Sequence, residues 1–198
     1  MKVKCDQDGI GKALEIINGG GIVVYPTDTV YGIGCDPYND KAVKKIYDIK
    51  SRDISKSLPV LTYSIETAKK IVLLDEFTEK IAEKFWPGPL TIVSKLIDED
   101  LKKTLSLNDK IAIRVPKHDC TLKILKECKF LVGTSANISG QSSFTNPDEC
   151  FRSIENYDIF VDGGTITSKA ESTIIEIENE KIKIIREGSL SKEDILEV

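Results

Sequence analysis

Several features that define common protein classes are absent, or nearly absent, from this 198-residue chain. Histidine occurs once, at position 118, and the five cysteines form no Cys-x-x-Cys pair. A zinc site is therefore not expected, and reduced thiols are the default for an odd number of unpatterned cysteines. The longest apolar runs have four or five residues, too few to span a membrane, and the N-terminus shows no secretory signal. These absences predict a cytoplasmic protein that has no metal site of its own.

The sequence also lacks the common signatures of nucleotide-binding and hydrolytic enzymes. It contains neither Gly-x-x-x-x-Gly-Lys-Ser/Thr nor Gly-x-Gly-x-x-Gly, so neither the P-loop nor the dinucleotide fingerprint applies. Ser135 and Ser139 lack the context of a nucleophile elbow. The net charge is −4, and Asp and Glu interleave the lysines, which is typical of solvated helix faces rather than of bulk electrostatic binding to nucleic acid.

What is present predicts one globular domain over residues 1–198. The chain is 40% hydrophobic and 30% charged, which is ordinary for a soluble domain with a sizeable core. Helical spacing predicts helices over 39–50 and 119–128, and apolar β-branched runs predict strands over 90–96 and 110–115. A hairpin is expected over 172–186. This alternation indicates an α/β (α+β) fold, with flanking helices on one twisted sheet that mixes parallel and antiparallel strands.

Two polar segments stand directly after apolar, strand-like runs. The first is Tyr-Pro-Thr-Asp-Thr-Val-Tyr-Gly at 25–32, and the second is Thr-Ser-Ala-Asn-Ile-Ser-Gly at 134–140. Polar loops at strand ends are where open α/β sheets bind ligands. Either segment is also compatible with an ordinary turn, because Pro, Thr, Asp and Asn favour turns. The glycines at 32 and 34 favour the ligand interpretation, since they allow backbone to approach a ligand closely.

Isolated cations accompany these two segments. Lys50 and Arg52 end a predicted helix, where cations also complement the helix dipole. Arg114 lies in an apolar strand and must point away from Ile113 and Val115, toward either a salt-bridge partner or a ligand. Arg186 ends a strand, where surface exposure is its default. Taken together, the hydroxyls, amides and cations predict a site for a polar, phosphate-bearing ligand.

The order of these motifs resembles the YrdC-like family of threonylcarbamoyl-AMP synthases in its single-domain form. The resemblance runs from residue 20 to residue 188 and is carried by segments 25–32, 50–52, 85–91, 114–116, 135–140, 162–164 and 171–174. It implies a deep, positively charged groove in a twisted mixed sheet. It also implies a nucleotidyltransferase that joins L-threonine, bicarbonate and ATP into threonylcarbamoyl-adenylate and releases pyrophosphate.

The resemblance further implies roles for particular residues. The L-threonine pocket is expected to include Thr29, Arg114, Thr134 and Ser172. The ATP site is expected to include Lys50, Arg52, Lys56, Ser135, Ala136, Asn137 and Arg186, with the Ala136 backbone assisting. Within this set Lys50 and Arg52 are the expected catalytic residues. Mg2+ would arrive with ATP and bridge its phosphate oxygens.

Partners and departures follow from the same resemblance. Proteins of a threonylcarbamoyl-transferase complex would use the product to modify tRNA, so tRNA contact by this chain is expected to be indirect or weak. Asp53 and Ser57 stand where the family commonly has proline, and Leu61 stands where a polar residue is frequent. Two alternatives stay open: a non-catalytic RNA-binding module that uses the same groove, and a carbamoyl-transfer role in metal-centre maturation.

Overall fold

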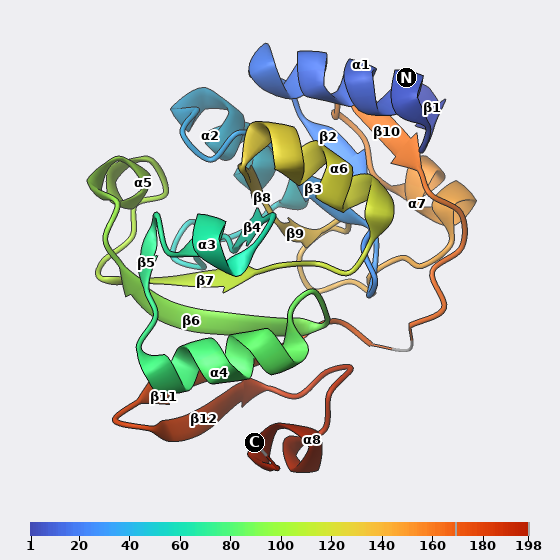
Figure 1. Ribbon diagram of the computed structural model, residues 1–198. Coiled ribbons are helices and arrows are strands. Elements are labelled where there is room, and N and C mark those ends of the chain that lie inside the picture. The colour runs from blue at the N-terminus through green and yellow to red at the C-terminus, as the bar shows by residue number, and fades with distance from the viewer. Residues whose placement is uncertain (169, 198) are drawn as a thin grey trace.

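The computed structural model describes residues 1–168 and 170–197 and divides the strands between two sheets (Figure 1). The five-stranded sheet has the order β1 (Lys2–Lys4), β10 (Ile159–Asp162), β2 (Val23–Tyr25), β3 (Gly32–Gly34) and β9 (Thr134–Ser135). The seven-stranded sheet has the order β12 (Lys181–Arg186), β11 (Thr173–Glu178), β6 (Leu90–Leu96), β7 (Lys110–Arg114), β4 (Val60–Thr62) and β8 (Phe130–Val132), with β5 (Val72–Leu73) paired to β6.

Both sheets mix strand directions. In the first, β1, β10 and β2 are parallel while β3 runs antiparallel to its two neighbours. In the second, the parallel pairs β11–β6 and β4–β7 alternate with antiparallel pairs. The predicted fold class, α/β with mixed strands and flanking helices, is confirmed. The expectation of one continuous sheet is corrected, and the division of the chain into a single domain stays a prediction.

The chain passes from one sheet to the other at Gly133, which separates β8 from β9. The sequence pattern predicts a single strand over 131–134, but a side chain at Gly133 would place its Cβ 2.3 Å from Leu61 Cγ. Glycine at this position therefore allows the backbone to pass close to Leu61 of β4. The two-residue strand β9 then pairs with β3 in the other sheet.

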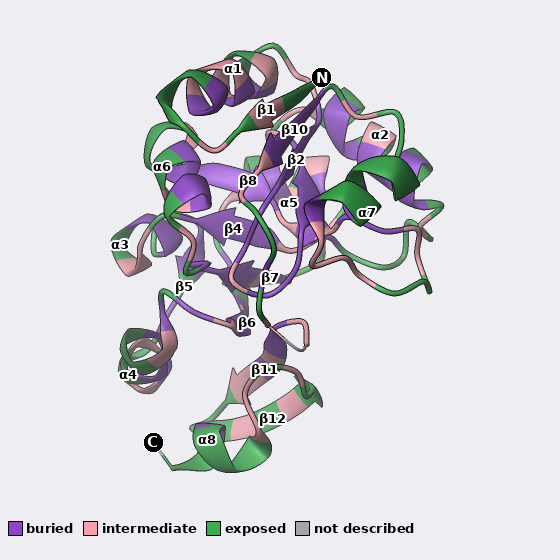
Figure 2. Cartoon of the chain, turned by 90° about the vertical axis from the view of Figure 1, so that its right-hand side faces the viewer, coloured by how far each residue is buried: buried purple, intermediate pink, exposed green. Residues whose placement is uncertain are grey.

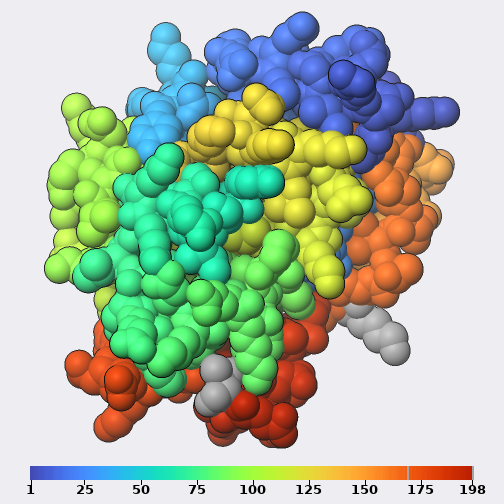
Figure 3. All heavy atoms as spheres, in the orientation of Figure 1, coloured from blue at the N-terminus to red at the C-terminus, as the bar shows by residue number. Residues whose placement is uncertain are grey.

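Eight helices are described. They are α1 (Gln7–Asn18), α2 (Asp40–Lys50), α3 (Ile65–Ala68), α4 (Glu76–Phe85), α5 (Glu99–Thr104), α6 (Asp119–Cys128), α7 (Pro147–Ser153) and α8 (Lys192–Leu196). Asn39 is the N-cap of α2, since its side chain accepts a hydrogen bond from the Ala42 N–H at 3.1 Å. In Figure 3, atoms of α1 in blue, α6 in yellow and α3 in teal form a continuous surface on one face.

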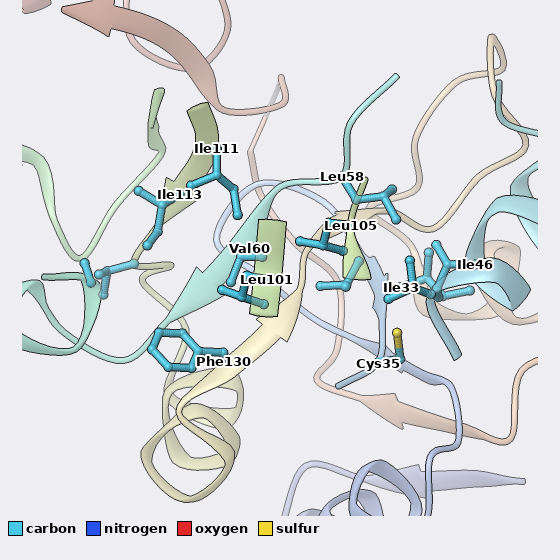
Figure 4. Close-up of a cluster of buried hydrophobic side chains, with 14 of the residues drawn as sticks. Ile33, Cys35, Ile46, Leu58, Val60, Leu101, Leu105, Ile111, Ile113 and Phe130 are labelled. Carbon is cyan, nitrogen blue, oxygen red and sulfur yellow. The ribbon is translucent and has the colours of Figure 1, made fainter. Parts of the chain in front are cut away.

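The main apolar core lies between the seven-stranded sheet and its helices and continues under α2. Figure 4 shows Ile111 and Ile113 of β7, Val60 of β4, Leu101 of α5 and Ile46 of α2 in this core. Burial is greatest in the central strands and falls toward β12 and α8 (Figure 2). A second cluster joins α1 and α6 to β2 and β10. Residues of both sheets belong to the main core, so the sheets share one interior.

Two of the five cysteines are bonded to each other, which corrects the expectation of reduced thiols. Cys5 follows β1, Cys120 lies in the first turn of α6, and the two form a disulfide with their Cα atoms 5.8 Å apart. Their separation of 115 residues gives no sequence signal, because the pairing depends on how α1 packs beside α6. Cys35, Cys128 and Cys150 are free thiols.

Within residues 1–168 and 170–197, the structure contains no helix that combines the length and apolar character of a membrane span.

Candidate functional site

A cavity of about 710 Å3 lies between the two sheets. Its walls come from β2, β3 and β9 on one side, from β4, β6, β7, β11 and β12 on the other, and from the loops at 50–59 and 137–141. Ten of the eleven residues predicted for the site line it: Thr29, Lys50, Arg52, Lys56, Arg114, Thr134, Ser135, Asn137, Ser172 and Arg186. Segments more than one hundred residues apart in the chain are thereby brought together.

Lys50 is the last residue of α2 and is almost completely buried, with 1% of its surface exposed. Its ammonium donates hydrogen bonds to the Ser135 carbonyl, to the Asn137 carbonyl at 2.7 Å and to Asn137 Oδ1 at 3.2 Å. Burial, followed by repulsion from Arg52, lowers the pKa of Lys50 to about 8, and Glu171 partly opposes this effect. The ammonium thus holds the 135–137 loop in place and leaves a positive charge at the cavity wall.

The helix ends immediately after Lys50, and this ending shapes the next part of the wall. Ser51 adopts a left-handed conformation, and the Arg52 N–H donates to the Tyr47 carbonyl at 2.9 Å. The Arg52 guanidinium then donates from Nε to the Lys56 carbonyl at 3.0 Å and from Nη2 to the Ser57 carbonyl at 2.9 Å. Arg52 therefore braces the 52–57 loop. The Lys56 side chain is exposed on the same loop, so both cations lie beside the cavity entrance.

Arg114 is held in the cavity wall through all three of its guanidinium nitrogens. Its Nε donates to the Gly88 carbonyl at 2.9 Å, Nη1 to Thr29 Oγ1 at 3.0 Å, and Nη2 to Asp28 Oδ1 at 2.6 Å. Burial lowers the pKa of Arg114, and the Asp28 carboxylate opposes that effect. Because a guanidinium has five N–H groups, one on each terminal nitrogen remains for a ligand. Arg114 therefore forms the salt bridge that its position allowed, while its role in binding a ligand stays a prediction.

Asp28 is a residue of this site to which the sequence reasoning assigned no role. Its carboxylate accepts from Arg114 and also from the Lys117 N–H at 2.8 Å. The signal was present, because Asp28 stands inside the motif at 25–32. The same motif also forms the turn that its composition suggests, since Thr27 Oγ1 accepts from the Val30 N–H at 3.2 Å and donates to the Val30 carbonyl at 2.6 Å.

The 134–137 segment is ordered by short-range contacts. Ser135 Oγ donates to Asn137 Oδ1 at 2.6 Å, and Asn137 Nδ2 donates to the Gln141 carbonyl at 2.5 Å. Thr134 lines the cavity from β9. Ala136 does not line it: this residue is fully buried, and its N–H donates to the Tyr31 carbonyl at 2.8 Å. The expected assistance of the Ala136 backbone in ATP binding stays a prediction.

Ser172, directly before β11, is 6% exposed and lines the cavity. Its hydroxyl shares a hydrogen bond of 2.8 Å with Thr91 Oγ1. Arg186 contacts the Ser172 carbonyl from Nε at 3.2 Å and from Nη2 at 2.8 Å, and it forms an ion pair with Glu171. Thr91 and Glu171 were not assigned roles from the sequence, although both belong to motifs that carried the family resemblance.

The charge inside the cavity is strongly one-sided. Its lining includes five cations, Lys50, Arg52, Lys56, Arg114 and Arg186, and, among the described residues, one carboxylate, Glu171. The apolar part of the floor comes from Leu61, Val93, Ala112 and Ile174. A cavity that combines apolar walls with several cations and hydroxyls can bind a small amphipathic molecule next to an anionic one. No group of three or more His, Cys, Asp or Glu residues is placed to hold a metal ion in the part of the chain that the structure describes.

Known proteins are similar to this chain in both sequence and fold. A model of the Sua5/YciO/YrdC family, described as telomere recombination, matches residues 15–188. The chain is 39% identical over 181 residues to a Methanocaldococcus jannaschii relative provisionally named threonylcarbamoyl-AMP synthase, with 88% of this chain and 82% of the relative covered. It is 32% identical over 195 residues to the threonylcarbamoyl-AMP synthase of Pyrococcus abyssi, with 94% of this chain and 56% of the relative covered.

The crystal structure of Pyrococcus abyssi Sua5 complexed with L-threonine matches the fold with a TM-score of 0.93 and 29% identity. The match covers 100% of this chain and 60% of that chain, so this chain spans less than two thirds of the Pyrococcus protein. The chain belongs to the Sua5/YciO/YrdC family. The family resemblance seen in the sequence motifs is thereby confirmed.

Proposed function

We propose that this protein is a threonylcarbamoyl-AMP synthase, a nucleotidyltransferase that converts L-threonine, bicarbonate and ATP into threonylcarbamoyl-adenylate and pyrophosphate. The observation that carries the proposal is the cavity that joins Arg114, with two N–H groups to spare, to four further cations. Its relatives from Methanocaldococcus jannaschii and Pyrococcus abyssi bear this name, and the Pyrococcus protein binds L-threonine in its crystal.

The inner end of the cavity is the proposed L-threonine pocket. Each terminal nitrogen of Arg114 keeps one N–H group for the carboxylate of L-threonine, and such a charge-assisted contact is stronger than a neutral hydrogen bond. Thr29, Thr134 and Ser172 supply hydroxyls around it, and the three are buried. Asp28 keeps Arg114 oriented while leaving these donors available.

The outer part is the proposed ATP site. The nucleophile in this reaction is the carbamate of threonine, an anion that must approach the α-phosphorus of another anion. Such an encounter depends on fixed positive charge and orientation more than on acid–base chemistry. We assign Arg52, Lys56 and Arg186 to the triphosphate, with Ser135 and Asn137 contacting the nucleotide from the loop that Lys50 holds. Lys50 at the end of α2 and Arg52, two residues further along the chain, are the proposed catalytic cations.

Mg2+ enters this proposal as part of the nucleotide substrate, bridging phosphate oxygens. Proteins of a threonylcarbamoyl-transferase complex would take up the product in the cytoplasm and carry the group to tRNA. The acidic net charge of −4 favours this indirect contact over direct RNA binding.

Pyrophosphate release tests the proposal. Purified protein is incubated with ATP and Mg2+, and L-threonine and bicarbonate are added singly and together. We expect release only when both are present, and loss of release in a folded Arg52→Ala variant. Turnover of the wild-type kind in folded Arg52→Ala would contradict the role of Arg52. Absence of release under every condition, together with salt-dependent tRNA binding, would favour the RNA-binding alternative.

A further inference from the structure

Glu171 is the one acidic side chain that lines the cavity within residues 1–168 and 170–197. It stands directly before Ser172, between the free end of β11 and the chain that follows β12. The Glu171 carbonyl accepts from the Ser189 N–H at 2.8 Å, and a side chain on Gly188 would place its Cβ 2.3 Å from the same carbonyl oxygen. The backbone at Glu171 is therefore held firmly, and its carboxylate is presented to the cavity from a fixed position.

In this structure the side chains of Glu171 and Arg186 form an ion pair with each other. Arg186 Nη1 donates to Glu171 Oε2, while Nε and Nη2 bond the carbonyl and hydroxyl of Ser172. Their side chains are 31% and 41% exposed, so the pair is accessible to ligands and contributes little to stability by itself. These contacts use four of the five N–H groups of Arg186, so a phosphate that takes two of its N–H groups must displace either Glu171 or Ser172.

The amino acid presents a complementary demand. L-threonine carries a carboxylate and an ammonium group on the same carbon, and Arg114 supplies the cation for the carboxylate. A buried ammonium also needs an anion or several acceptors. Asp28 is already shared by Arg114 and the Lys117 N–H, which leaves Glu171 as the available carboxylate.

Sheet register places Glu171 on the appropriate side of the pocket. Arg186 is opposite Ile174, Ile174 is opposite Thr91, and β6 with Thr91 adjoins β7 with Arg114. Arg114 lies on β7 and Arg186 on β12, and these strands are three strand-to-strand spacings of about 4.8 Å apart. Both residues line the same cavity. The hydrogen bond between Thr91 and Ser172 lies between them. On the β11 side of Arg114, the cavity wall is thus formed by Thr91, Ser172 and Glu171.

We propose that Glu171 binds the α-ammonium group of the amino-acid substrate and that Arg186, released from Glu171, binds the triphosphate of ATP. The inference rests on the proposed function and deepens it. Each ligand then removes the competitor of the other, because ATP draws Arg186 away from Glu171 and the ammonium replaces Arg186 there. Binding of the two substrates is consequently cooperative, and the coupling is the same in both directions.

Calorimetry without bicarbonate measures this coupling without turnover. L-threonine is titrated into the protein with and without α,β-methylene-ATP and Mg2+, and the nucleotide is titrated with and without L-threonine. In the wild-type protein we expect each ligand to bind about tenfold more tightly in the presence of the other. In Glu171→Gln, which keeps the shape and a hydrogen-bond acceptor, we expect this coupling to disappear. The nucleotide should bind that variant at least as tightly as it binds the wild type, since Arg186 is freed, while L-threonine binds more weakly.

A substrate analogue separates a charge contact from a loss of structure. The hydroxy-acid analogue of L-threonine, in which a hydroxyl replaces the ammonium, should bind the wild-type protein much more weakly than L-threonine does. Glu171→Gln should bind the two compounds almost equally. Glu178→Gln is the matched control, because Glu178 ends β11, the strand that begins two residues after Glu171, is 64% exposed and pairs with Lys110 outside the cavity. It should behave like the wild type in every titration.

The outcomes are distinct. The inference would be overturned, and the proposed function left intact, if wild type and Glu171→Gln showed the same coupling between nucleotide and L-threonine. The same holds if both preferred L-threonine over its hydroxy-acid analogue to the same degree. Weaker binding of both nucleotide and L-threonine to Glu171→Gln would also overturn it, because that pattern indicates a structural role. A wild-type protein that binds neither ligand would contradict the proposed function itself.

Discussion

Lys50 is a cation that the fold buries at an energetic cost. Its three hydrogen bonds end on two carbonyl oxygens and an amide oxygen, which solvate the ammonium without neutralising it. The lowered pKa, about 8 instead of 10.5, measures this cost. A residue retained under such a penalty is typical of a site whose ligand supplies the missing negative charge.

The penalty gives Lys50 a signature in the pH dependence of stability. Below pH 8 the folded and unfolded states both carry the proton, and the cost of burying it is fully present. Between pH 8 and 10.5 the folded state loses the proton first, so the free energy of unfolding rises with pH by up to roughly 3 kcal/mol at about 1.4 kcal/mol per unit. We expect Lys50→Met to lose this rise and to lose adenylate formation.

Urea unfolding of both proteins at pH 7.5 and pH 10 checks this prediction. Other groups that titrate in this window, tyrosines above all, contribute to both proteins, so the difference between the two proteins is the quantity of interest. Parallel pH profiles for wild type and Lys50→Met would contradict the buried, charged state of Lys50.

At the scale of elements, the two sheets meet at a narrow junction. The Val132 N–H at the end of β8 donates to the Cys35 carbonyl just after β3 at 2.9 Å, and the Tyr25 hydroxyl of β2 donates to the Val132 carbonyl at 2.8 Å. Gly34 makes this approach possible, since a Cβ there would lie 1.9 Å from the Val132 carbonyl oxygen. The cavity lies directly beside the junction, because Gly32 and Gly133 line it.

In Gly34→Ala, the new methyl group should therefore push the backbone at Gly34 away from the backbone at Val132, because no flexible side chain can move aside to make room. We expect it to lower the free energy of unfolding by about 3 kcal/mol, at the upper end of overpacking effects. Gly11→Ala is the control, because Gly11 lies inside α1 with open space around its Cα. That variant should gain about 0.5–1 kcal/mol. Chemical denaturation of the two variants measures the contrast, and equal effects would contradict the close approach.

The sequence predicted the elements that carry their own local signals. The helix over 119–128, the strand over 90–96 and the hairpin after 172 are confirmed, because periodicity, caps and turn residues coincide there. Strands β3 and β9 were missed. Each has two or three residues and β3 contains two glycines, so neither has the length or the apolar pattern of a predicted strand. β9 also depends on pairing with β3, which is distant in sequence.

For the candidate site too, features with a local sequence signal could be predicted, and contacts between distant segments could not. Motifs in sequence order indicated which residues to examine, and the cavity brings ten of the eleven together. The partners of those residues could not be found this way. Asp28 with Arg114, and Glu171 with Arg186, are joined by the arrangement of the strands and loops, which no local pattern encodes.

At the scale of the whole molecule, the Cys5–Cys120 disulfide ties the N-terminal strand to α6 across 115 residues. A cross-link over so long a loop restricts the unfolded chain, and removing one typically costs about 2–4 kcal/mol. We expect a reductant to lower the free energy of unfolding of the wild-type protein by that amount. The double variant Cys5→Ser, Cys120→Ser should be as unstable as the reduced protein and should not respond to reductant.

Thermal or urea unfolding with and without dithiothreitol provides the measurement, and Cys35→Ser serves as a control that keeps the bond. Identical stability in both conditions for the wild type would contradict the cross-link.

The cations of the cavity have a consequence for competition among anions. The protein as a whole carries a charge of −4, while the cavity gathers five cations against one carboxylate, so the outer surface is more acidic than the net charge indicates. A compact anion the size of a nucleotide enters the region where the field is attractive. A long polyanion meets the repulsive exterior first, at distances within the Debye length of about 8 Å. The charge distribution therefore favours entry of a compact anion over that of a long polyanion.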